Sequence, residues 1–300
     1  MQAKRRVAIV GVTGFIGSGL PAMFVERGWQ VTGVSRSGGG TVEGVGEWRV
    51  SAEFDPAGHE AVVNLAGAPI DKRWTEANKR VFHASRVGVT RALVDGICRV
   101  AEAERPRVLV NGSAVGYYGD GGDVVLDEQS PGGVGYLAGL CGEWEGAAWQ
   151  ARGCGVRVAC LRTGVVLGAG GAAFEKLARV FKTGLGGKLG SGRQWMPWIH
   201  VSDLRRAIVR MVESGGLAGP VNGVAPNPER NADFTRKFAK ALRRPAVLPV
   251  PGFALKLALG GFGEALLGGQ RAVPKALVDD GFEFRYPRLE DALRDLVSGD

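Results

Sequence analysis

The 300-residue sequence predicts an α/β protein built around a doubly wound parallel sheet. Short apolar runs suited to buried strands recur along the first half of the chain, and segments with helix-like spacing separate them. A glycine-rich turn joins the first apolar run to the first helical segment. Hydrophobic residues make up 45% and charged residues 23% of the chain, which is typical of a folded protein rather than a disordered one.

The first strand is expected over Arg5–Val10, because the run RRVAIV suits a strand buried on both faces of a parallel sheet. The turn GVTGFIG follows directly, and Leu20–Arg27 then has helix-like spacing that stops at Gly28. This order of strand, glycine turn and helix is typical of a Rossmann-type dinucleotide-binding domain. The alternative is a purely structural turn, since the spacing is GxxGxxG rather than GxGxxG.

The turn is suited to holding a pyrophosphate, because a phosphate needs exposed backbone N–H groups that side chains do not block. Gly11 permits the tight turn, Gly14 the close approach of the ligand, and Gly17 the packing of helix against strand. The candidate cofactor-binding residues here are Gly11, Thr13, Gly14, Phe15, Ile16 and Gly17.

A second strand is expected over Gln30–Val34, and it ends in Ser35 and Arg36 about twenty residues after the glycines. An acidic residue at this place would bind the ribose hydroxyls of NAD, whereas a hydroxyl and a guanidinium suit the 2′-phosphate of NADP. Ser35 and Arg36 therefore predict NADP(H) as the cofactor. A solvated loop arginine is the alternative for Arg36.

Three further strands are expected over Ala61–Leu65, Arg107–Asn111 and Val156–Leu161, with helical segments between them. The first of these closes in Asn64-Leu65-Ala66-Gly67. Small residues at the carboxyl end of a strand allow an adenine or ribose to lie against the backbone. Leu65, Ala66 and Gly67 are therefore candidate cofactor-binding residues.

Composition and charge exclude several other classes of protein. The net charge of +8 is dispersed rather than clustered, which suits an anionic cofactor or substrate better than nucleic acid. No apolar run approaches a membrane span, no signal peptide is expected, and no metal-like spacing of ligands occurs. The expected location is therefore the cytoplasm, where the four cysteines would be reduced thiols.

Several longer motifs make the chain similar to a known family. The motifs are NLAGAPIDKRWTEANK (64–79), SAVGYYGD (113–120), LRTGVVLG (161–168), GLGGKLGSGRQWMPWIHVSDL (184–204) and GQRAVPKAL with the later GFEFRYP. The chain resembles the atypical extended short-chain dehydrogenases/reductases called epimerase family proteins, which are similar to sugar-nucleotide epimerases. The resemblance covers nearly the full length.

The resemblance implies a Rossmann core with a small C-terminal α+β lobe that closes over the nicotinamide end of NADP(H). An NADP-binding domain is expected over residues 1–168, completed by parts of 199–225, with a substrate-side region over 169–300 that includes the lobe 227–300. In the lobe, residues 281–287 alternate like an edge strand. The resemblance also places Arg86 beside the cofactor and Val166 in the nicotinamide pocket; a helix-surface arginine is the alternative for Arg86.

The resemblance further implies catalysis by a serine, a tyrosine and a lysine four residues after the tyrosine, since an unassisted tyrosine has a pKa near 10. Ser113 follows the expected strand and is the candidate serine; a plain turn residue is the alternative. Tyr136 is in the expected region, but Leu140 stands four residues on, and no lysine occurs between Lys79 and Lys176. The usual route to a reactive phenolate is therefore missing.

Tyr117 and Tyr118 follow Ser113 closely, and either could act as the proton donor instead of Tyr136. Packing or hydrogen bonding within their loop is the alternative. In the second half, Arg193, Trp195 and Trp198 bring a cation and two indoles together, a group that could bind a planar or anionic substrate. Aromatic packing between the lobes is the alternative for these three residues.

Two functions remain open from the sequence. The first is an NADP(H)-dependent oxidoreductase or epimerase acting on a small polar or nucleotide-linked substrate. The second is a non-catalytic NADP(H)-binding sensor or regulatory protein, which the missing lysine favours. A small-molecule substrate is the expected partner, without nucleic acid or membrane, and a homodimer is compatible with helices that flank such a sheet.

Overall fold

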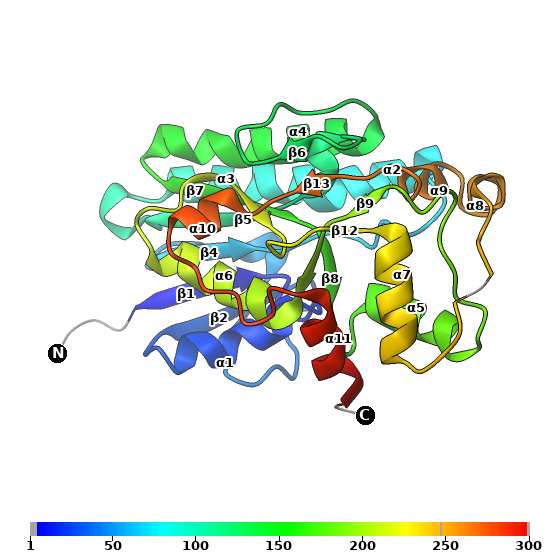
Figure 1. Cartoon of the computed structure of the whole chain (residues 1–300). Coiled ribbons are helices and arrows are strands. Elements are labelled where there is room, and N and C mark those ends of the chain that lie inside the picture. The colour runs from blue at the N-terminus through cyan, green and yellow to red at the C-terminus, as the bar shows by residue number, and fades with distance from the viewer. Residues whose placement is uncertain (1–4, 247, 299–300) are drawn as a thin grey trace.

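The computed structural model describes residues 5–246 and 248–298, so residues 1–4 of the expected domain 1–168 lie outside the described residues (Figure 1). In the described part, seven strands form one sheet in which every neighbouring pair is parallel. The strands are β1 (Arg6–Val10), β2 (Gln30–Ser35), β3 (Glu47–Val50), β4 (Ala61–Asn64), β5 (Val108–Ala114), β7 (Arg157–Thr163) and β11 (Gly219–Gly223).

The strand order is β11-β7-β5-β4-β1-β2-β3, so the direction of winding reverses between β1 and β4. Val10 at the end of β1 pairs with Val34 of β2 on one side and with Asn64 of β4 on the other. Ligands of doubly wound sheets bind in the crevice outside the carboxyl ends of strands at such a switch point. The predicted doubly wound sheet is confirmed, with β3 and β11 added at its two edges.

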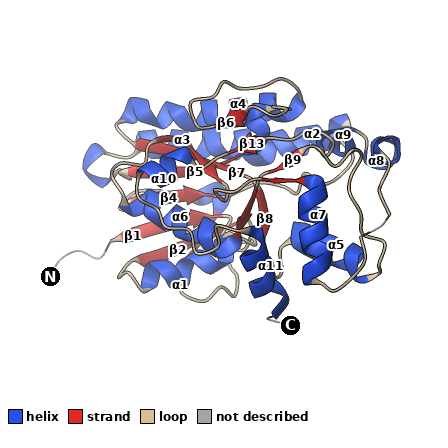
Figure 2. Ribbon diagram, in the orientation of Figure 1, coloured by secondary structure: helices blue, strands red, loops and turns tan. Residues whose placement is uncertain are grey.

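Helices cover both faces of the sheet, as Figure 2 shows. Val7 and Ile9 of β1 join one core with α1 (Leu20–Val25), α6 (Val201–Glu213) and α10 (Lys275–Asp279). Ala8 and Val10 join the opposite core with α3 (Val89–Arg99) and α4 (Tyr136–Trp149). Because successive side chains of a strand point to opposite faces, the continuous apolar run of β1 supplies both cores.

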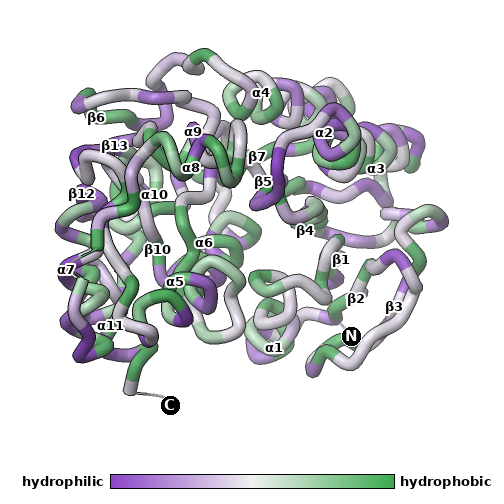
Figure 3. Tube along the Cα trace, turned by 90° about the vertical axis from the view of Figure 1, so that its right-hand side faces the viewer, coloured by the Kyte–Doolittle hydropathy of each residue, from purple (hydrophilic) through white to green (hydrophobic). Residues whose placement is uncertain are grey.

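The C-terminal elements form a third core beside the sheet (Figure 3). Phe174, Phe234 and Phe238 pack there with Leu289 and Leu293. Its helices are α5 (Ala172–Lys182), α7 (Asn231–Ala241) and α11 (Leu289–Ser298), while α2 (Glu76–His83), α8 (Gly252–Leu259) and α9 (Gly261–Ala265) lie around the nearby cleft. Short strands pair as β8 (Val165–Leu167) with β10 (Trp198–His200), β9 (Trp195–Met196) with β12 (Glu229–Arg230), and β6 (Val125–Leu126) with β13 (Arg271–Ala272).

The edge strand expected over 281–287 is wrong, because this segment is irregular. Backbone amides of this segment bond to a side chain rather than to a neighbouring strand. The amides of Arg285 and Tyr286 donate to the buried carboxylate of Asp203 at 2.9 and 2.8 Å. The alternating residues Phe282 and Phe284 pack against the core next to the sheet. Alternation here reflects anchoring side chains rather than strand pairing.

The expectation of four reduced thiols is also wrong for two cysteines. Cys98, near the end of α3, forms a disulfide with Cys154, which ends the 3₁₀ turn after α4. Their Cα atoms lie 5.5 Å apart although 56 residues separate them in sequence. Packing of α3 against that turn brings the two together, and the spacing of cysteines along the chain carries no sign of it. Cys141 and Cys160 are free and buried.

Residues 5–246 and 248–298 contain neither a membrane-spanning helix nor a metal-binding group. None of the helices in these ranges has the length and apolar character needed to cross a membrane. No three His, Cys, Asp or Glu side chains in the same ranges come together as a metal-binding group.

Candidate functional site

The turn between β1 and α1 can pack this closely against its neighbours only because it is built from glycine. Gly11 has a φ of +83°, and a Cβ there would lie 3.1 Å from the carbonyl carbon of Leu65. A Cβ at Gly17 would lie 2.5 Å from the carbonyl oxygen of Gly11, which is closer than real side chains come. Thr13 and Gly14 are exposed between them. The turn is therefore a backbone cradle of the kind that holds a pyrophosphate.

Arg205 of α6 holds this turn in place. Its Nε donates to the carbonyl of Ile16 at 3.0 Å, and its Nη2 donates to the carbonyl of Phe15 at 2.5 Å. A Cβ at Gly19 would lie 2.3 Å from the guanidinium carbon of Arg205, so this glycine leaves space for the anchor. The sequence carries no signal for Arg205, because about 190 residues separate donor and acceptor.

A cavity of about 600 Å³ opens at the carboxyl ends of β1 and β2, beside the glycine turn. Arg36 lines it, whereas the hydroxyl of buried Ser35 donates to the carbonyl of Gly39 at 3.0 Å and shapes the loop. Its other walls are Val10, Val34, Val50, Ser51, Ala52, Phe54, Ala84, Gly88, Val89, Ala92, Leu93, Asp95, Gly96 and Arg99. The shape and position suit the adenosine half of a dinucleotide.

Part of that wall was not expected from the sequence. Ser51, Ala52 and Phe54 reach the cavity because they follow β3, an edge strand that the sequence analysis did not predict. The apolar residues Trp48 and Val50 alternate with polar ones in this strand, and that alternation is the signal that could have located it.

The expected small residues after β4 lie at the same edge of the sheet. The amide of Leu65 donates to the carbonyl of Val10 at 2.9 Å, and the amide of Ala66 donates to the side chain of Asn64 at 3.2 Å. Gly67 faces Arg86: a Cβ at this glycine would lie 3.2 Å from the guanidinium carbon. Gly67 thus allows the arginine side chain to lie against the backbone.

Arg86 has an unusual environment for an arginine. It lies in a π-helical turn, Ala84–Gly88, between α2 and α3, and such turns often mark functional positions. Its guanidinium carbon lies 5.3 Å from the ring centre of Trp144. Its Nη1 is buried and has no hydrogen-bond partner among the described residues. Burial lowers the pKa of Arg86, and a guanidinium held in this way is ready for an acceptor from a ligand.

The structure places Ser113 and Tyr118 in one buried hydrogen-bond network. Ser113 Oγ donates to Glu145 Oε1 at 2.7 Å, and Arg162 makes two 2.8 Å bonds to the same carboxylate. Arg162 Nη1 also donates to the Tyr118 hydroxyl at 3.0 Å, which in turn lies 2.7 Å from Asn222 Oδ1. Burial raises the pKa of Tyr118 to about 12. This network joins β5, β7 and β11 through α4.

The other two tyrosines differ in their surroundings. Tyr117 is half-buried, with the guanidinium carbon of Arg162 3.5 Å above its ring. Tyr136 opens α4, and its ring centre lies 5.0 Å from that of Trp74. The Tyr136 hydroxyl is buried without a hydrogen-bond partner among the described residues. Tyr136 lines a cavity.

That cavity has a volume of about 660 Å³ and is bordered by the start of α4 and by the helices α8 and α9. It is lined by Trp74, Lys79, Gly116, Gly119, Asp120, Val134, Gly135, Tyr136, Leu137, Lys256, Gly261, Glu264, Ala265, Leu267, Gly268 and Gln270. Charged side chains ring it, and an aromatic pair forms one wall. Lys79 and Lys256 were not candidates from the sequence, because α2 and the C-terminal helices meet only in the folded chain.

The residues expected to bind substrate separate in the structure. Trp195 is half-exposed and donates its indole N–H to Asp123 at 2.8 Å. The guanidinium carbons of Arg230 and Arg271 lie 4.5 and 4.8 Å from the centre of its ring. Arg193 is exposed near it. Trp198 is completely buried and donates to the carbonyl of Asn227 at 3.1 Å, so it presents no surface to a ligand.

Val166 lies in β8 and pairs with Ile199 of β10. It is half-buried and packs against the same core as Ile16 and Leu65. This position is consistent with a wall near the switch point of the sheet.

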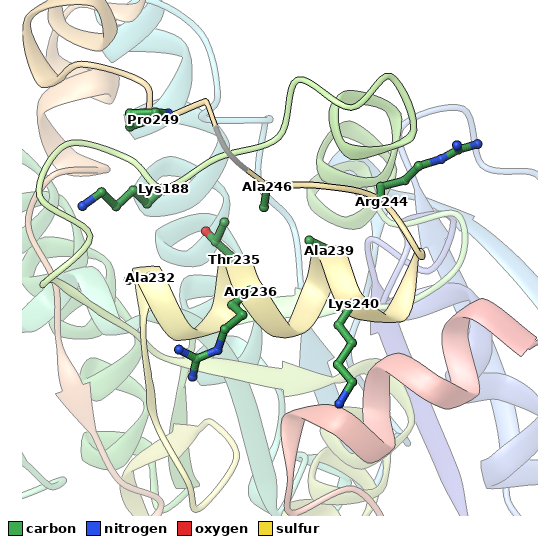
Figure 4. A pocket seen from close by; sticks show the side chains of 9 residues that line it. All are labelled: Lys188, Ala232, Thr235, Arg236, Ala239, Lys240, Arg244, Ala246 and Pro249. Carbon is green, nitrogen blue, oxygen red and sulfur yellow. The ribbon is translucent and has the colours of Figure 1, made fainter.

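A separate hollow of about 480 Å³ lies along α7 (Figure 4). Thr235, Ala239 and Ala246 face it, while Arg236 and Lys240 extend away from it in Figure 4. Arg236 is also paired with Asp233 at 2.7 Å. Its lining residues come from α7 and from the segments around Lys188 and Pro249, whereas doubly wound proteins bind ligands at the carboxyl ends of the sheet strands.

The fold, the glycine cradle and the two cavities define a Rossmann-type dinucleotide-binding protein. Residues 7–222 match the family described as "NAD dependent epimerase/dehydratase family", and the chain belongs to this family. Residues 250–296 match a second family, a domain of unknown function, DUF1731. The resemblance inferred from the sequence motifs is confirmed.

Relatives extend over the whole chain. The epimerase family protein SDR39U1 homolog, chloroplastic, of Arabidopsis thaliana is 40% identical, over 99% of this chain and 88% of its own. The crystal structure of human epimerase family protein SDR39U1 (isoform 2) with NADPH has a TM-score of 0.91 and 34% identity, over 98% of this chain and 100% of the human one. The predicted cofactor is thus present in the structure of a relative.

A second solved structure is that of the nucleoside-diphosphate sugar epimerase from Corynebacterium glutamicum, with a TM-score of 0.80 and 31% identity. The match covers 99% of this chain and 59% of that protein. Similarity to these relatives therefore extends along nearly the whole chain.

Proposed function

We propose that this protein binds NADP(H) and acts as an oxidoreductase or epimerase on a small polar or nucleotide-linked substrate. One observation carries the proposal: a single helical segment borders both cavities. Lys79 lines the 660 Å³ cavity, whereas Gly88 and Val89 line the 600 Å³ cavity. Arg86 lies between them in the chain, with its buried nitrogen unpartnered among the described residues. A bound dinucleotide that reaches from one cavity to the other would supply the missing acceptor.

Residues of this chain fit each part of NADP(H). The glycine cradle would hold the pyrophosphate, and Phe54 and Val89 would form walls for the adenine. Arg36 would bind the 2′-phosphate, because a guanidinium offers two parallel N–H donors to phosphate oxygens. Arg86 would bind near the nicotinamide end. When bound, NADP(H) supplies or accepts the hydride.

The 660 Å³ cavity supports the proposed class of substrate. Hydrogen-bond donors and acceptors for hydroxyl, carbonyl or phosphate groups come from Lys79, Lys256, Glu264 and Gln270. Trp74 provides a flat apolar wall. Sites of this kind bind sugars and nucleotides through a few polar groups and an aromatic surface. The nucleotide-linked alternative is favoured by the related sugar epimerase from Corynebacterium glutamicum.

We assign the proton transfer to Tyr136. Its hydroxyl belongs to a cavity-lining residue and has no partner in the described chain, whereas Ser113 and Tyr118 are bonded within the buried network. Ser113 and Tyr118 would then position the loop at the cavity rather than exchange protons. Tyr117, under Arg162, would have the same positioning role.

The cofactor proposal is tested by titrating the ligand-free protein with NADPH and with NADH while tryptophan fluorescence is followed. We expect selective binding of NADPH, and Arg36→Ala should weaken NADPH binding about tenfold or more because a charge-assisted phosphate contact is lost. Binding of NADH should change little. Arg91→Ala, an exposed arginine on α3 outside the cavity, is the matched control. Absence of NADPH binding by the wild-type protein would overturn the proposal.

A second function, a non-catalytic NADP(H)-binding sensor, is favoured by Leu140. This residue stands where the catalytic lysine is usual, and it is buried in an apolar cluster with Phe82 and Trp144. The two functions differ in turnover. Oxidation of NADPH with a panel of sugar nucleotides and small carbonyl compounds, lost in Tyr136→Phe, would support the enzyme; tight binding with no turnover of any compound would support the sensor.

A further inference from the structure

The proton-transferring tyrosine of such a site needs a positive charge beside it, because an isolated phenol holds its proton at neutral pH. Helix α4 does not provide this charge. Four residues after Tyr136 stands Leu140, which is 5% exposed and packs in the cluster with Phe82 and Trp144. Other elements must therefore provide the charge if Tyr136 exchanges protons.

Lys79 provides one positive charge from α2. Its Nζ lies 5.2 Å from the centre of the Tyr136 ring, and both side chains line the 660 Å³ cavity. Glu76, one turn earlier, holds the ammonium group through a 2.8 Å ion pair. The lysine is thus kept over the ring rather than free to extend into solvent.

Arg86 provides a second positive charge from the π-helical turn. Trp144 connects it to the tyrosine: the Arg86 guanidinium lies over the Trp144 ring, and Tyr136 packs against the cluster that contains Trp144. The Nη1 of Arg86 and the hydroxyl of Tyr136 are both buried, and neither has a hydrogen-bond partner in the described residues. Two such groups at one site indicate a place where a ligand completes the bonding.

We propose that Lys79 and Arg86 together replace the lysine that α4 lacks, and that they act as positioning residues which make Tyr136 competent for proton transfer. This inference rests on the proposed function. In the reductive direction the proton of the Tyr136 hydroxyl passes to the carbonyl oxygen of the substrate, while a reduced nicotinamide dinucleotide gives a hydride to the carbonyl carbon. The phenolate that remains is stabilised by the two cations. The reverse reaction returns the proton to the phenolate.

The charges that face Tyr136 come from three elements. The pKa of Tyr136 is raised, chiefly by burial, and Lys79 and Arg86 oppose that rise. The carboxylates of Glu76 on α2 and Glu143 on α4 raise it. Removal of a cation and removal of a carboxylate should therefore move the pKa of Tyr136 in opposite directions, which a merely structural role for these residues would not cause.

The test measures the pKa of Tyr136 directly in the full chain without cofactor. The chain has four tyrosines, so ¹³C-labelled tyrosine gives few NMR signals, and Tyr136→Phe identifies the relevant one. We expect Lys79→Gln and Arg86→Gln each to raise the pKa by about 1, and Glu76→Gln to lower it, as opposite and like charges at this range do. Arg86→Lys should largely restore the wild-type value. Arg80→Gln, an exposed cation on the same helix, should leave it unchanged.

The two proposals can fail separately. An unchanged Tyr136 pKa in Lys79→Gln and in Arg86→Gln, with both variants folded by circular dichroism, would overturn this inference even if NADPH binds. Failure of the wild-type protein to bind NADPH would overturn the proposed function, whatever the tyrosine signal does. A rise of the pKa in both variants, with NADPH binding retained in Lys79→Gln, would support both proposals.

Discussion

Arg205 of α6 donates to the carbonyl of Phe15 at 2.5 Å, so a helix from the second half of the chain holds the glycine turn that follows β1. The same guanidinium donates to the carbonyl of Ile16 at 3.0 Å. Two backbone acceptors of the turn therefore depend on one distant side chain. The shape of the cofactor cradle is coupled in this way to the packing of α6.

Replacement of Arg205 should disturb both the fold and the cofactor site. We expect Arg205→Ala to lower the free energy of unfolding by about 1–3 kcal/mol, because two part-buried carbonyls lose their donor. NADPH affinity should fall as well, since the cradle is no longer held. Urea unfolding and the fluorescence titration measure the two effects. Equal NADPH affinity in wild type and variant would show that the anchor does not shape the cradle.

Addition of one methyl group at Gly67 should displace the guanidinium group of Arg86. In Gly67→Ala the new Cβ would lie 3.2 Å from the guanidinium carbon, so the flexible arginine must shift by a few tenths of an ångström. We expect weaker NADPH binding with the fold intact. Gly146→Ala, inside α4 with open space around its Cβ, is the control and should raise stability by about 0.5–1 kcal/mol without changing affinity. Similar affinities in both variants would argue against a cofactor role for Arg86.

The buried ion pair of Arg162 and Glu145 should be costly to break on one side. We expect Arg162→Met to lower the free energy of unfolding by about 3–5 kcal/mol, because the carboxylate of Glu145 stays buried without its cation. The double variant Arg162→Met/Glu145→Gln should recover much of this loss. Denaturant unfolding of both proteins and the wild type measures the difference. A double variant no more stable than the single one would contradict this explanation.

The disulfide between Cys98 and Cys154 can be tested by counting free thiols and by replacing both cysteines. In non-reducing denaturant, thiol titration should find two free thiols, from Cys141 and Cys160, and four after reduction. We expect the variant with serine at both bonded positions to lose about 2–4 kcal/mol of stability, the usual effect for a loop of this length. Four thiols in the unreduced protein would show that the bond does not form in the purified chain.

Acid should destabilise the protein through His59. This histidine is 5% exposed and lies 2.9 Å from Thr32 Oγ1. Burial lowers its pKa, and the charge of Arg6 adds to the effect. Its folded pKa is below the unfolded value of about 6.5, so its contribution is fully present above that pH and is lost as the pH falls through 6.5 toward the folded pKa. The free energy of unfolding, measured at several pH values, should fall less steeply with acidification in His59→Gln than in the wild type. An unchanged slope would contradict the assignment of this pH dependence to His59.

Much of the fold follows from local patterns in the sequence. The apolar runs at β1, β2 and β4 predict buried parallel strands, because such strands need apolar residues on both faces. The edge strand β3 was missed, since it has four residues and none of them is fully buried. The irregular segment 281–287 was mistaken for a strand because two anchoring aromatic residues alternate there.

The sequence predicted some residues of the candidate site but not the side chains that bond to them. The glycine turn and Arg36 could be proposed from the sequence because each directly follows a strand, and Arg36 lines the 600 Å³ cavity. The partners of Ser113 and Tyr118 were not found, since Glu145, Arg162 and Asn222 come from three other elements. The complete burial of Trp198 agrees with the packing alternative, and no local pattern decided between packing and ligand binding.

The sequence by itself determined the strand–turn–helix unit, the cradle at Gly11–Gly17 and the family, because these depend on residues that are neighbours along the chain. Only the tertiary structure decided that Arg205 supports the cradle, that Cys98 meets Cys154, and that Lys79 lies over Tyr136. Such contacts join elements that are far apart in sequence. Their geometry arises when the helices pack on the sheet, and no local periodicity records which side chains that packing brings together.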